Sequence, residues 1–264
     1  MTGRASLRAG VIAAGHGIRL RREGYALKPL VPVAGVTLVE RVLGSLTETG
    51  PSEVAIIVND GSTAVRDHVS SRSWPFALRW IVETTPSSMH SFLRIVEALS
   101  ADGQSGPFLI STVDTIAAPG AFAAFAAASQ SLDAAGAPGI PGVPGIDVAL
   151  AVTEAQADDD HPLRVRLAPG SSHIAAIGAA AAGSPWITAG YYSVRASVLR
   201  EANEARRDGV SALRDFFGRL HERGFRLEAV PVASGVDVDR PGDVGAAERL
   251  LSQVGARIDT RVTR

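Results

Sequence analysis

The chain has 264 residues, of which 46% are hydrophobic and 20% charged, so it carries enough apolar material for the core of an enzyme-sized globular protein. Its formal net charge is -1, with basic residues scattered along the chain, which argues against a nucleic-acid partner. The absence of cysteine excludes disulfides, thiolate metal sites and cysteine nucleophiles, and it fits a cytoplasmic protein.

The sequence also gives no sign of a membrane partner. No stretch approaches the roughly 18 apolar residues that a membrane-spanning helix needs. The apolar run at residues 10–14 is too short for a signal peptide. We therefore expect a soluble, cytoplasmic protein.

Apolar strands and amphipathic helices alternate in the first half of the chain. Strands are predicted at residues 7–14, 54–58, 76–82 and 107–113, and helices at 38–46 and 89–99. Because the strands are apolar along their whole length, the alternation predicts an α/β layered domain built on a mainly parallel sheet.

The second half is predicted to be more antiparallel. It follows a Pro/Gly loop at residues 136–145, where proline removes amide donors and glycine loosens the chain. The predicted elements are strands at 148–152 and 187–194, a hairpin from 164–167 and 173–177, a helix at 210–220, a strand at 225–232 and a helix at 241–251. We expect one domain over residues 1–264, with halves at about 7–135 and 146–254.

The first strand runs into a glycine turn, Ala13-Ala14-Gly15-His16-Gly17, that lets backbone amides approach an anion. Leu20 replaces the third glycine of the dinucleotide fingerprint, and the Walker pattern is absent. Arg19 and Lys28 follow, and two cations beside a glycine loop suit a triphosphate. Lys28 is the single lysine among 26 basic residues, and a planar guanidinium does not replace its compact ammonium. The alternatives are a tight turn and a solvated lysine.

Three carboxylates form a second candidate set. Asp114 follows the strand at 107–113, at the sheet edge where α/β proteins place ligands, and a carboxylate there suits Mg²⁺. Asp237 and Asp239 alternate along an extended segment, so they share one face and can hold one cation. The alternative interpretations are a turn cap for Asp114 and, for Asp239, an N-cap of the helix that Pro241 opens.

Together these motifs resemble the nucleotidyltransferases of the nucleotide-diphospho-sugar transferase superfamily. The similar segments are residues 13–20, 28–35 and 38–43, followed in the family's order by Asp114, Gly190-Tyr191-Tyr192 and Asp237-Val238-Asp239. The resemblance spans about residues 9–252. It implies a Rossmann-like three-layer α/β/α fold with a mixed, mainly parallel sheet, a nucleotide-binding half at 7–135 and an acceptor-binding half at 146–254.

The resemblance further implies a Mg²⁺-dependent reaction between a nucleoside triphosphate and a phosphorylated small-molecule acceptor. The acceptor would be a sugar 1-phosphate, a polyol phosphate or phosphocholine. Its phosphate attacks the α-phosphorus, and pyrophosphate leaves. By this resemblance the residues divide into three groups. Ala13, Ala14, Gly15 and Gly17 cradle the triphosphate; Arg19 holds the pyrophosphate and Lys28 the reacting phosphates; Asp114 with Asp237 or Asp239 holds Mg²⁺.

The resemblance leaves the nucleobase open. The sugar-phosphate branch usually shows Gln and later Gly-Thr-Ala around the base, and residues 84–92 lack both. Ser88 and Ser91, at the head of this helix, look more like the cytidylyltransferases that act on phosphocholine or inositol phosphate and are expected to bind the nucleotide. The loop from Gly17 to Lys28 is long for the molybdopterin guanylyltransferases, which the chain otherwise resembles.

The acceptor and the oligomeric state also stay open. Trp186, Tyr191, Tyr192 and Arg195 are ordinary candidates for an acceptor pocket, with core packing as the alternative. Other functions remain as alternatives: a catalytically silent module that binds nucleotide sugars, a molybdopterin nucleotidyltransferase-like enzyme, and a glycosyltransferase. A glycosyltransferase is expected to keep an Asp-x-Asp motif at the end of the central strand. This chain instead has Asp114 followed by Thr115 and Ile116.

Overall fold

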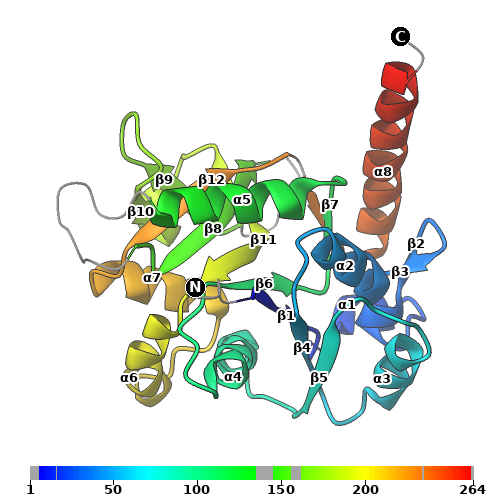
Figure 1. The fold of residues 1–264 in the computed structure, drawn as a ribbon, viewed down its shortest axis with the longest axis horizontal. Helices are drawn as coiled ribbons and strands as arrows, with labels where there is room; N and C mark the ends of the chain where they lie inside the picture. The colour runs from blue at the N-terminus through cyan, green and yellow to red at the C-terminus, as the bar shows by residue number, and fades with distance from the viewer. Residues whose placement is uncertain (1–5, 16, 135–144, 156–161, 234, 263–264) are drawn as a thin grey trace, which may run out of the picture.

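The computed structural model describes residues 6–15, 17–134, 145–155, 162–233 and 235–262, with side chains described up to residue 253. Of the Pro/Gly run at 136–145, all but Gly145 lies outside the described residues. Figure 1 shows a central sheet with helices on both faces, and a long C-terminal helix that projects from the body.

The first half of the chain forms the parallel part of the sheet, as predicted. Its strands are β1 (Arg8–Ile12), β4 (Glu53–Val58), β5 (Ala77–Val82) and β6 (Phe108–Thr112). β1 lies parallel between β4 and β6, and β4 pairs parallel with β5. Ile12 is opposite both Ile57 and Thr112, so these strands reach the same edge of the sheet at their carboxyl ends.

The second half adds mainly antiparallel strands, which confirms the prediction of a mixed sheet. They are β8 (Val148–Glu154), β9 (Arg164–Leu167), β10 (Ile174–Ile177), β11 (Trp186–Val194) and β12 (Leu227–Pro231). β11 pairs antiparallel with β6, β8 and β9, and β9 with β10 forms the expected hairpin. β12, in contrast, is parallel to β8. The sheet order is β10-β9-β11-β6-β1-β4-β5, with β8 and β12 branching from β11.

Helices cover the two faces of this sheet and bury separate hydrophobic clusters (Figure 1). One face carries α4 (Ser88–Ser100), α6 (Ala202–Arg207) and α7 (Leu213–Glu222), and the other carries α2 (Leu38–Thr47), α3 (Thr63–Ser70) and α5 (Ala121–Ala134). Apolar residues at helical spacing explain α2, α4 and α7, most of whose buried apolar side chains join the clusters that cover the sheet. The result is the three-layer α/β/α arrangement that the family resemblance implied.

Several short elements have too few residues for a periodic pattern, and the sequence did not predict them. They are α1 (Ile18–Arg21), α3, α6, the 3₁₀ turns η1 (Lys28–Leu30), η2 (Gly178–Ala181) and η3 (Ala196–Glu201), and the strands β2 (Pro32–Val33), β3 (Val36–Thr37), β7 (Thr115–Ala117) and β13 (Gly235–Asp237). The last helix, α8 (Pro241–Val262), runs well beyond the predicted end at residue 251. Among the described helices, none is long and apolar enough to cross a membrane.

Candidate active site

Two short strands bring the predicted carboxylates together at the carboxyl edge of the parallel strands. β7 pairs antiparallel with β13, and Thr115 lies opposite Asp237. The hydroxyl of Thr115 donates to Asp237 Oδ1 at 3.1 Å, and the amide of Val238 donates to the carbonyl of Asp114 at 3.0 Å. The chain segment after β6 is thereby joined to a segment more than a hundred residues away.

Lys28 lies between two of these carboxylates. Its Nζ donates to Asp114 Oδ2 at 2.5 Å and also to Asp239 Oδ1. The residue is 8% exposed, so the solvated-lysine interpretation is wrong. Burial alone would lower the pKa of Lys28, but the charges and hydrogen bonds of Asp114 and Asp239 outweigh it and raise the pKa. Lys28 is therefore a fixed positive charge.

The glycine turn provides room for this lysine. Gly17 has a φ of 56°, and a Cβ added there would lie 2.6 Å from Lys28 Cβ. Only glycine fits such a left-handed position against a packed side chain without strain. Ala13 and Ala14 are buried at the end of β1, whereas Gly15 is exposed with open space around its Cα. His16 lies outside the described residues.

Two of the carboxylates have opposite pKa shifts. Burial would raise the pKa of Asp114, but the ammonium of Lys28 outweighs it and lowers the pKa. Loss of hydration in the cleft, followed by the negative charge of Asp114, raises the pKa of Asp237 to about 7 although part of this residue is open to solvent. Gly190 of β11 makes room for the hydrogen-bonded side chains of Thr115 and Asp237. A Cβ at this position would lie 2.0 Å from Thr115 Oγ1 and 3.1 Å from Asp237 Oδ1.

A cavity of about 320 Å³ opens directly over this cluster. It is lined by the predicted residues Arg19, Ser88, Asp237 and Asp239, and Arg19 is exposed and faces it from α1. Ser91 lies instead in the core, 3% exposed, with its hydroxyl 2.6 Å from that of Thr85. The structure thus brings one of the two predicted serines to the cavity.

The N-cap interpretation of Asp239 is wrong. The carboxylate of Asp239 accepts a hydrogen bond from Lys28. The carboxylate that caps the start of α8 is that of Asp243, which accepts from the backbone amides of Asp239 and Arg240 at 2.9 and 2.7 Å. Asp114 accepts from Lys28, and α5 begins only at Ala121. Both carboxylates are oriented by the lysine and not by a helix end.

Of the four candidates for an acceptor pocket, one lies at the cavity. Tyr192 lines it, 6% exposed, while Tyr191 is a core residue stacked on Phe122 at a centroid distance of 4.4 Å. Trp186 packs at the start of β11. Arg195 forms an ion pair with Asp133. The core interpretation therefore holds for Tyr191.

Sequence reasoning missed two arginines that line the same cavity. Arg214 is the second residue of α7, and Arg240 precedes α8. Neither stands in a recognisable motif, and the chain has many arginines, so no local signal separates them from surface residues. With Arg19 they make three arginines that line one cavity.

Comparison with known proteins gives one family match and several partial relatives. A model of the MobA-like NTP transferase domain matches residues 9–221. The bifunctional protein GlmU of Enterococcus faecalis is 33% identical over 105 residues, which is 40% of this chain and 21% of that protein. A bifunctional IPC transferase and DIPP synthase of Rubrobacter xylanophilus is 41% identical over 75 residues, 28% of this chain and 17% of that protein. The matched part thus spans about a fifth of these relatives.

Solved structures share the fold over nearly the whole chain. The inositol-1-phosphate CTP transferase from T. maritima has a TM-score of 0.72 at 18% identity, covering 95% of this chain and 97% of that one. A UDP-glucose pyrophosphorylase complexed with UDP-glucose has a TM-score of 0.73 at 15% identity, covering 92% and 97%. At these identities the likeness establishes the fold.

Proposed function

Because the chain belongs to the MobA-like NTP transferase domain family, we propose that it transfers a nucleoside monophosphate from a nucleoside triphosphate to a phosphorylated small alcohol. An oxygen of the acceptor phosphate attacks the α-phosphorus, a new P–O–P link forms, and the bond to the β-phosphate breaks to release pyrophosphate. The acceptor class is a sugar 1-phosphate, a polyol phosphate or phosphocholine. This choice is supported by the resemblance of the signature segments and by the named activities of the relatives.

One observation carries the proposal: a buried lysine and three carboxylates meet at one end of a cavity that three arginines line. Lys28 is held by Asp114 and Asp239, and the cavity reaches Asp237. Nucleotidyl transfer requires little covalent chemistry from the protein, since it depends on positioning and on neutralising phosphate charge. A site of fixed cations and hard oxygen ligands fits this need.

Asp114 and Asp237 suit a magnesium ion. Among the described residues there is no group of three or more His, Asp or Glu side chains arranged to hold a metal, but Mg²⁺ usually binds one or two carboxylates and completes its shell with water and substrate phosphates. Loss of hydration and then the negative charge of Asp114 raise the pKa of Asp237, and a bound cation would relieve the repulsion between the two carboxylates. We prefer Asp237 to Asp239 as the second ligand because the negative charge of Asp114 acts on Asp237, whereas the carboxylate of Asp239 is already neutralised by Lys28. When bound, Mg²⁺ would neutralise charge on the triphosphate.

Different residues of the chain then bind different phosphate groups of the two substrates. Gly15 and Gly17 present backbone to the triphosphate, and Arg19 holds the leaving pyrophosphate. Lys28 keeps its proton and lies where the α-phosphate and the incoming phosphate meet. Arg214, on the α7 side of the cavity, binds the acceptor phosphate.

The first test is a thermal-shift screen of CTP, UTP, GTP, ATP and dTTP with Mg²⁺. A nucleotide at about 100 times its Kd adds about 2.7 kcal/mol of stability, so one base should stand out. With that nucleotide, pyrophosphate release is measured against a panel of phosphorylated alcohols, using Asp114→Asn as the inactive control.

The outcomes separate the competing functions. Turnover with one acceptor supports the proposal. Selection of GTP with a pterin phosphate acceptor would instead support the molybdopterin nucleotidyltransferase-like alternative. Tight nucleotide binding with no pyrophosphate release in the presence of any acceptor would support a silent binding module. Release of a nucleoside diphosphate from a nucleotide sugar would support a glycosyltransferase.

A further inference from the structure

The first turns of α4 and α7 are bonded to each other beside the cavity. The amide of Leu213, the first residue of α7, donates to Ser88 Oγ at 3.0 Å. In return the amide of Met89 donates to the carbonyl of Ser211 at 3.1 Å. The first amides of a helix have no partner within it, and here Ser88 of α4 and Ser211, two residues before α7, supply the acceptors.

The Ser88 hydroxyl acts on α7 and not on its own helix. The N-cap of α4 is Ser87, whose Oγ accepts from the amide of His90 at 3.5 Å. The N-cap of α7 is Ala212, which has no side-chain acceptor. Ser88 thus takes the place of a capping residue for α7, across 125 positions of sequence.

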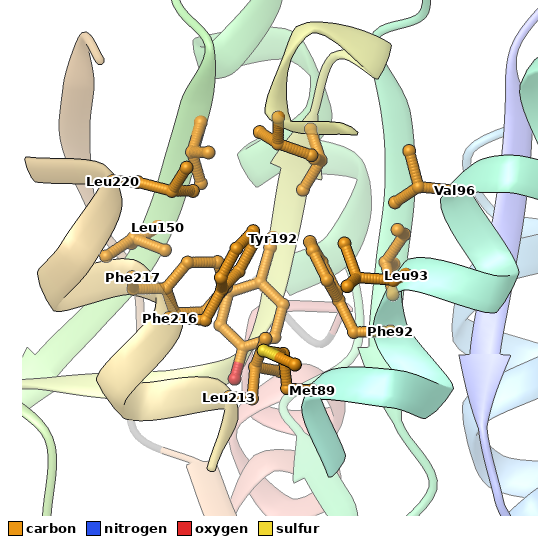
Figure 2. Close-up of a cluster of buried hydrophobic side chains, with 14 of the residues drawn as sticks. Met89, Phe92, Leu93, Val96, Leu150, Tyr192, Leu213, Phe216, Phe217 and Leu220 are labelled. Carbon is orange, nitrogen blue, oxygen red and sulfur yellow. The ribbon is translucent and has the colours of Figure 1, made fainter. Parts of the chain in front are cut away.

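An aromatic cluster makes the two helices one packed unit (Figure 2). Phe92 of α4 contacts Phe216 and Phe217 of α7 at centroid distances of 6.1 and 5.6 Å. Tyr192 of β11 packs on Phe217 at 4.9 Å. Close-packed rings leave little freedom for α7 to shift without α4.

The residue after Leu213 is Arg214, which lines the cavity. Its charge reaches the Tyr192 hydroxyl, where it opposes the upward pKa shift caused by burial and by Asp237 and Asp114. We infer that Ser88 is a positioning residue: by holding the Leu213 amide it fixes the start of α7 and so sets Arg214 for the acceptor phosphate. Only the role of Arg214 in this inference rests on the proposed function. Ser88 then serves the acceptor side of the site, whereas the sequence suggested the nucleotide side.

The first test needs no ligand. Amide hydrogen exchange of the 264-residue chain is followed by NMR in Ser88→Ala, Ser88→Thr and the neighbouring control Ser87→Ala. We expect Leu213 to exchange about fivefold faster in Ser88→Ala, in line with the loss of one hydrogen bond, and at the parent rate in Ser88→Thr. Ser87→Ala should speed exchange at His90 and leave Leu213 unchanged. Equal exchange at Leu213 in all four proteins, or equal acceleration by both alanines, would overturn the inference.

The second test uses inorganic phosphate as a probe, with the amide signals of Leu213 and Arg214 followed during a titration. The Kd for phosphate at Arg214 should rise several-fold in Ser88→Ala and return in Ser88→Thr, whereas the Kd of the nucleotide selected by the thermal-shift screen should not change. A rise in the nucleotide Kd alone would assign Ser88 to the nucleotide and overturn the inference. If phosphate leaves the parent signals of Arg214 unmoved, the acceptor role of Arg214 fails, while the exchange experiment still tests the link from Ser88 to α7.

Discussion

Replacing Lys28 with methionine should destabilise the unliganded protein, because it leaves the carboxylates of Asp114 and Asp239 unneutralised. The side chain of Lys28 is 9% exposed, that of Asp114 20% and that of Asp239 52%. Breaking a buried pair costs about 3–5 kcal/mol, whereas an exposed pair contributes about 1 kcal/mol or less. Asp114 retains some solvent contact, so we expect a loss of about 3 kcal/mol. At about 2–4 °C per kcal/mol for a chain of this size, Tm should fall by about 6–12 °C.

Calorimetry with and without Mg²⁺ connects this loss to the proposed metal site. Lys28→Met has more uncompensated negative charge beside Asp114 and Asp237, so Mg²⁺ should raise its Tm more than it raises the Tm of the parent. Pyrophosphate release should nevertheless stay about 100-fold or more below the parent, because the metal does not supply the lysine's charge between the reacting phosphates.

Lys28→Arg provides the matched control, since it keeps the charge and changes its shape. It should recover much of the stability and only part of the rate, because the planar guanidinium does not fit the ammonium's place between Asp114 and Asp239. The reasoning is refuted if Lys28→Met melts with the parent in the absence of Mg²⁺. An arginine variant as fast as the parent would equally refute the argument that the lone lysine is a chemical requirement.

The remaining predictions concern the carboxylates and the glycine turn. Asp114→Asn should abolish pyrophosphate release while keeping Tm within a few degrees, because asparagine still offers an oxygen to Lys28 and Asp239 still neutralises the lysine. Unfolding like that of a core mutant would instead assign Asp114 a structural role. Asp237→Asn should reduce activity more than Asp239→Asn at saturating Mg²⁺, and equal small losses would remove Asp237 as a ligand. A pKa raised to about 7 means that the native Asp237 keeps its proton while the unfolded one ionises near pH 4, so the parent loses stability as pH rises across this window. Without Mg²⁺, the free energy of unfolding of Asp237→Asn should therefore increasingly exceed that of the parent from pH 4 to pH 7. The difference should reach on the order of 1 kcal/mol, because the solvent contact of Asp237 weakens the effect. Urea titrations that show no such increase would contradict the raised pKa of Asp237. Gly17→Ala should cost about 1–2 kcal/mol and reduce activity, which the same titrations and a pyrophosphate assay measure, and an unaffected variant would show that the turn is less tight than described.

The sequence predicted α2, α4, α7 and the buried strands because their apolar residues repeat often enough to define a face. It did not predict the long helix α5, whose alanine-rich sequence lacks a distinct apolar face. α2, α4 and α7 each show this repeat, and the buried strands of the parallel half are apolar along their length. β7 and β13 have three residues each, too few for any repeat, yet their pairing brings Thr115 to Asp237. The short elements that build the site are therefore the ones that local patterns miss.

The candidate site was predictable as a set of residues but not as a set of contacts. Gly17, Lys28 and Asp114 stand in recognisable motifs, whereas the ion pair from Lys28 to Asp239 spans 211 positions of sequence. Arg214 had no signal because it depends on where α7 begins, and that start is fixed by Ser88 from another helix. Long-range contacts of this kind follow from the fold and are not written in any local pattern.

The residues that follow the family match contribute two carboxylates to the candidate site. The matched region ends at residue 221, while Asp237 and Asp239 lie beyond it. Val238 and Ala247, from this later segment, are buried in one cluster with Leu20, Val31 and Val33, which flank the loop that carries Lys28. Burial of that apolar surface and the pair from Lys28 to Asp239 act on the same two segments, so the C-terminal residues and the lysine loop stabilise each other. A change that loosens either segment should therefore disturb the cations and the carboxylates together, although they come from opposite ends of the chain.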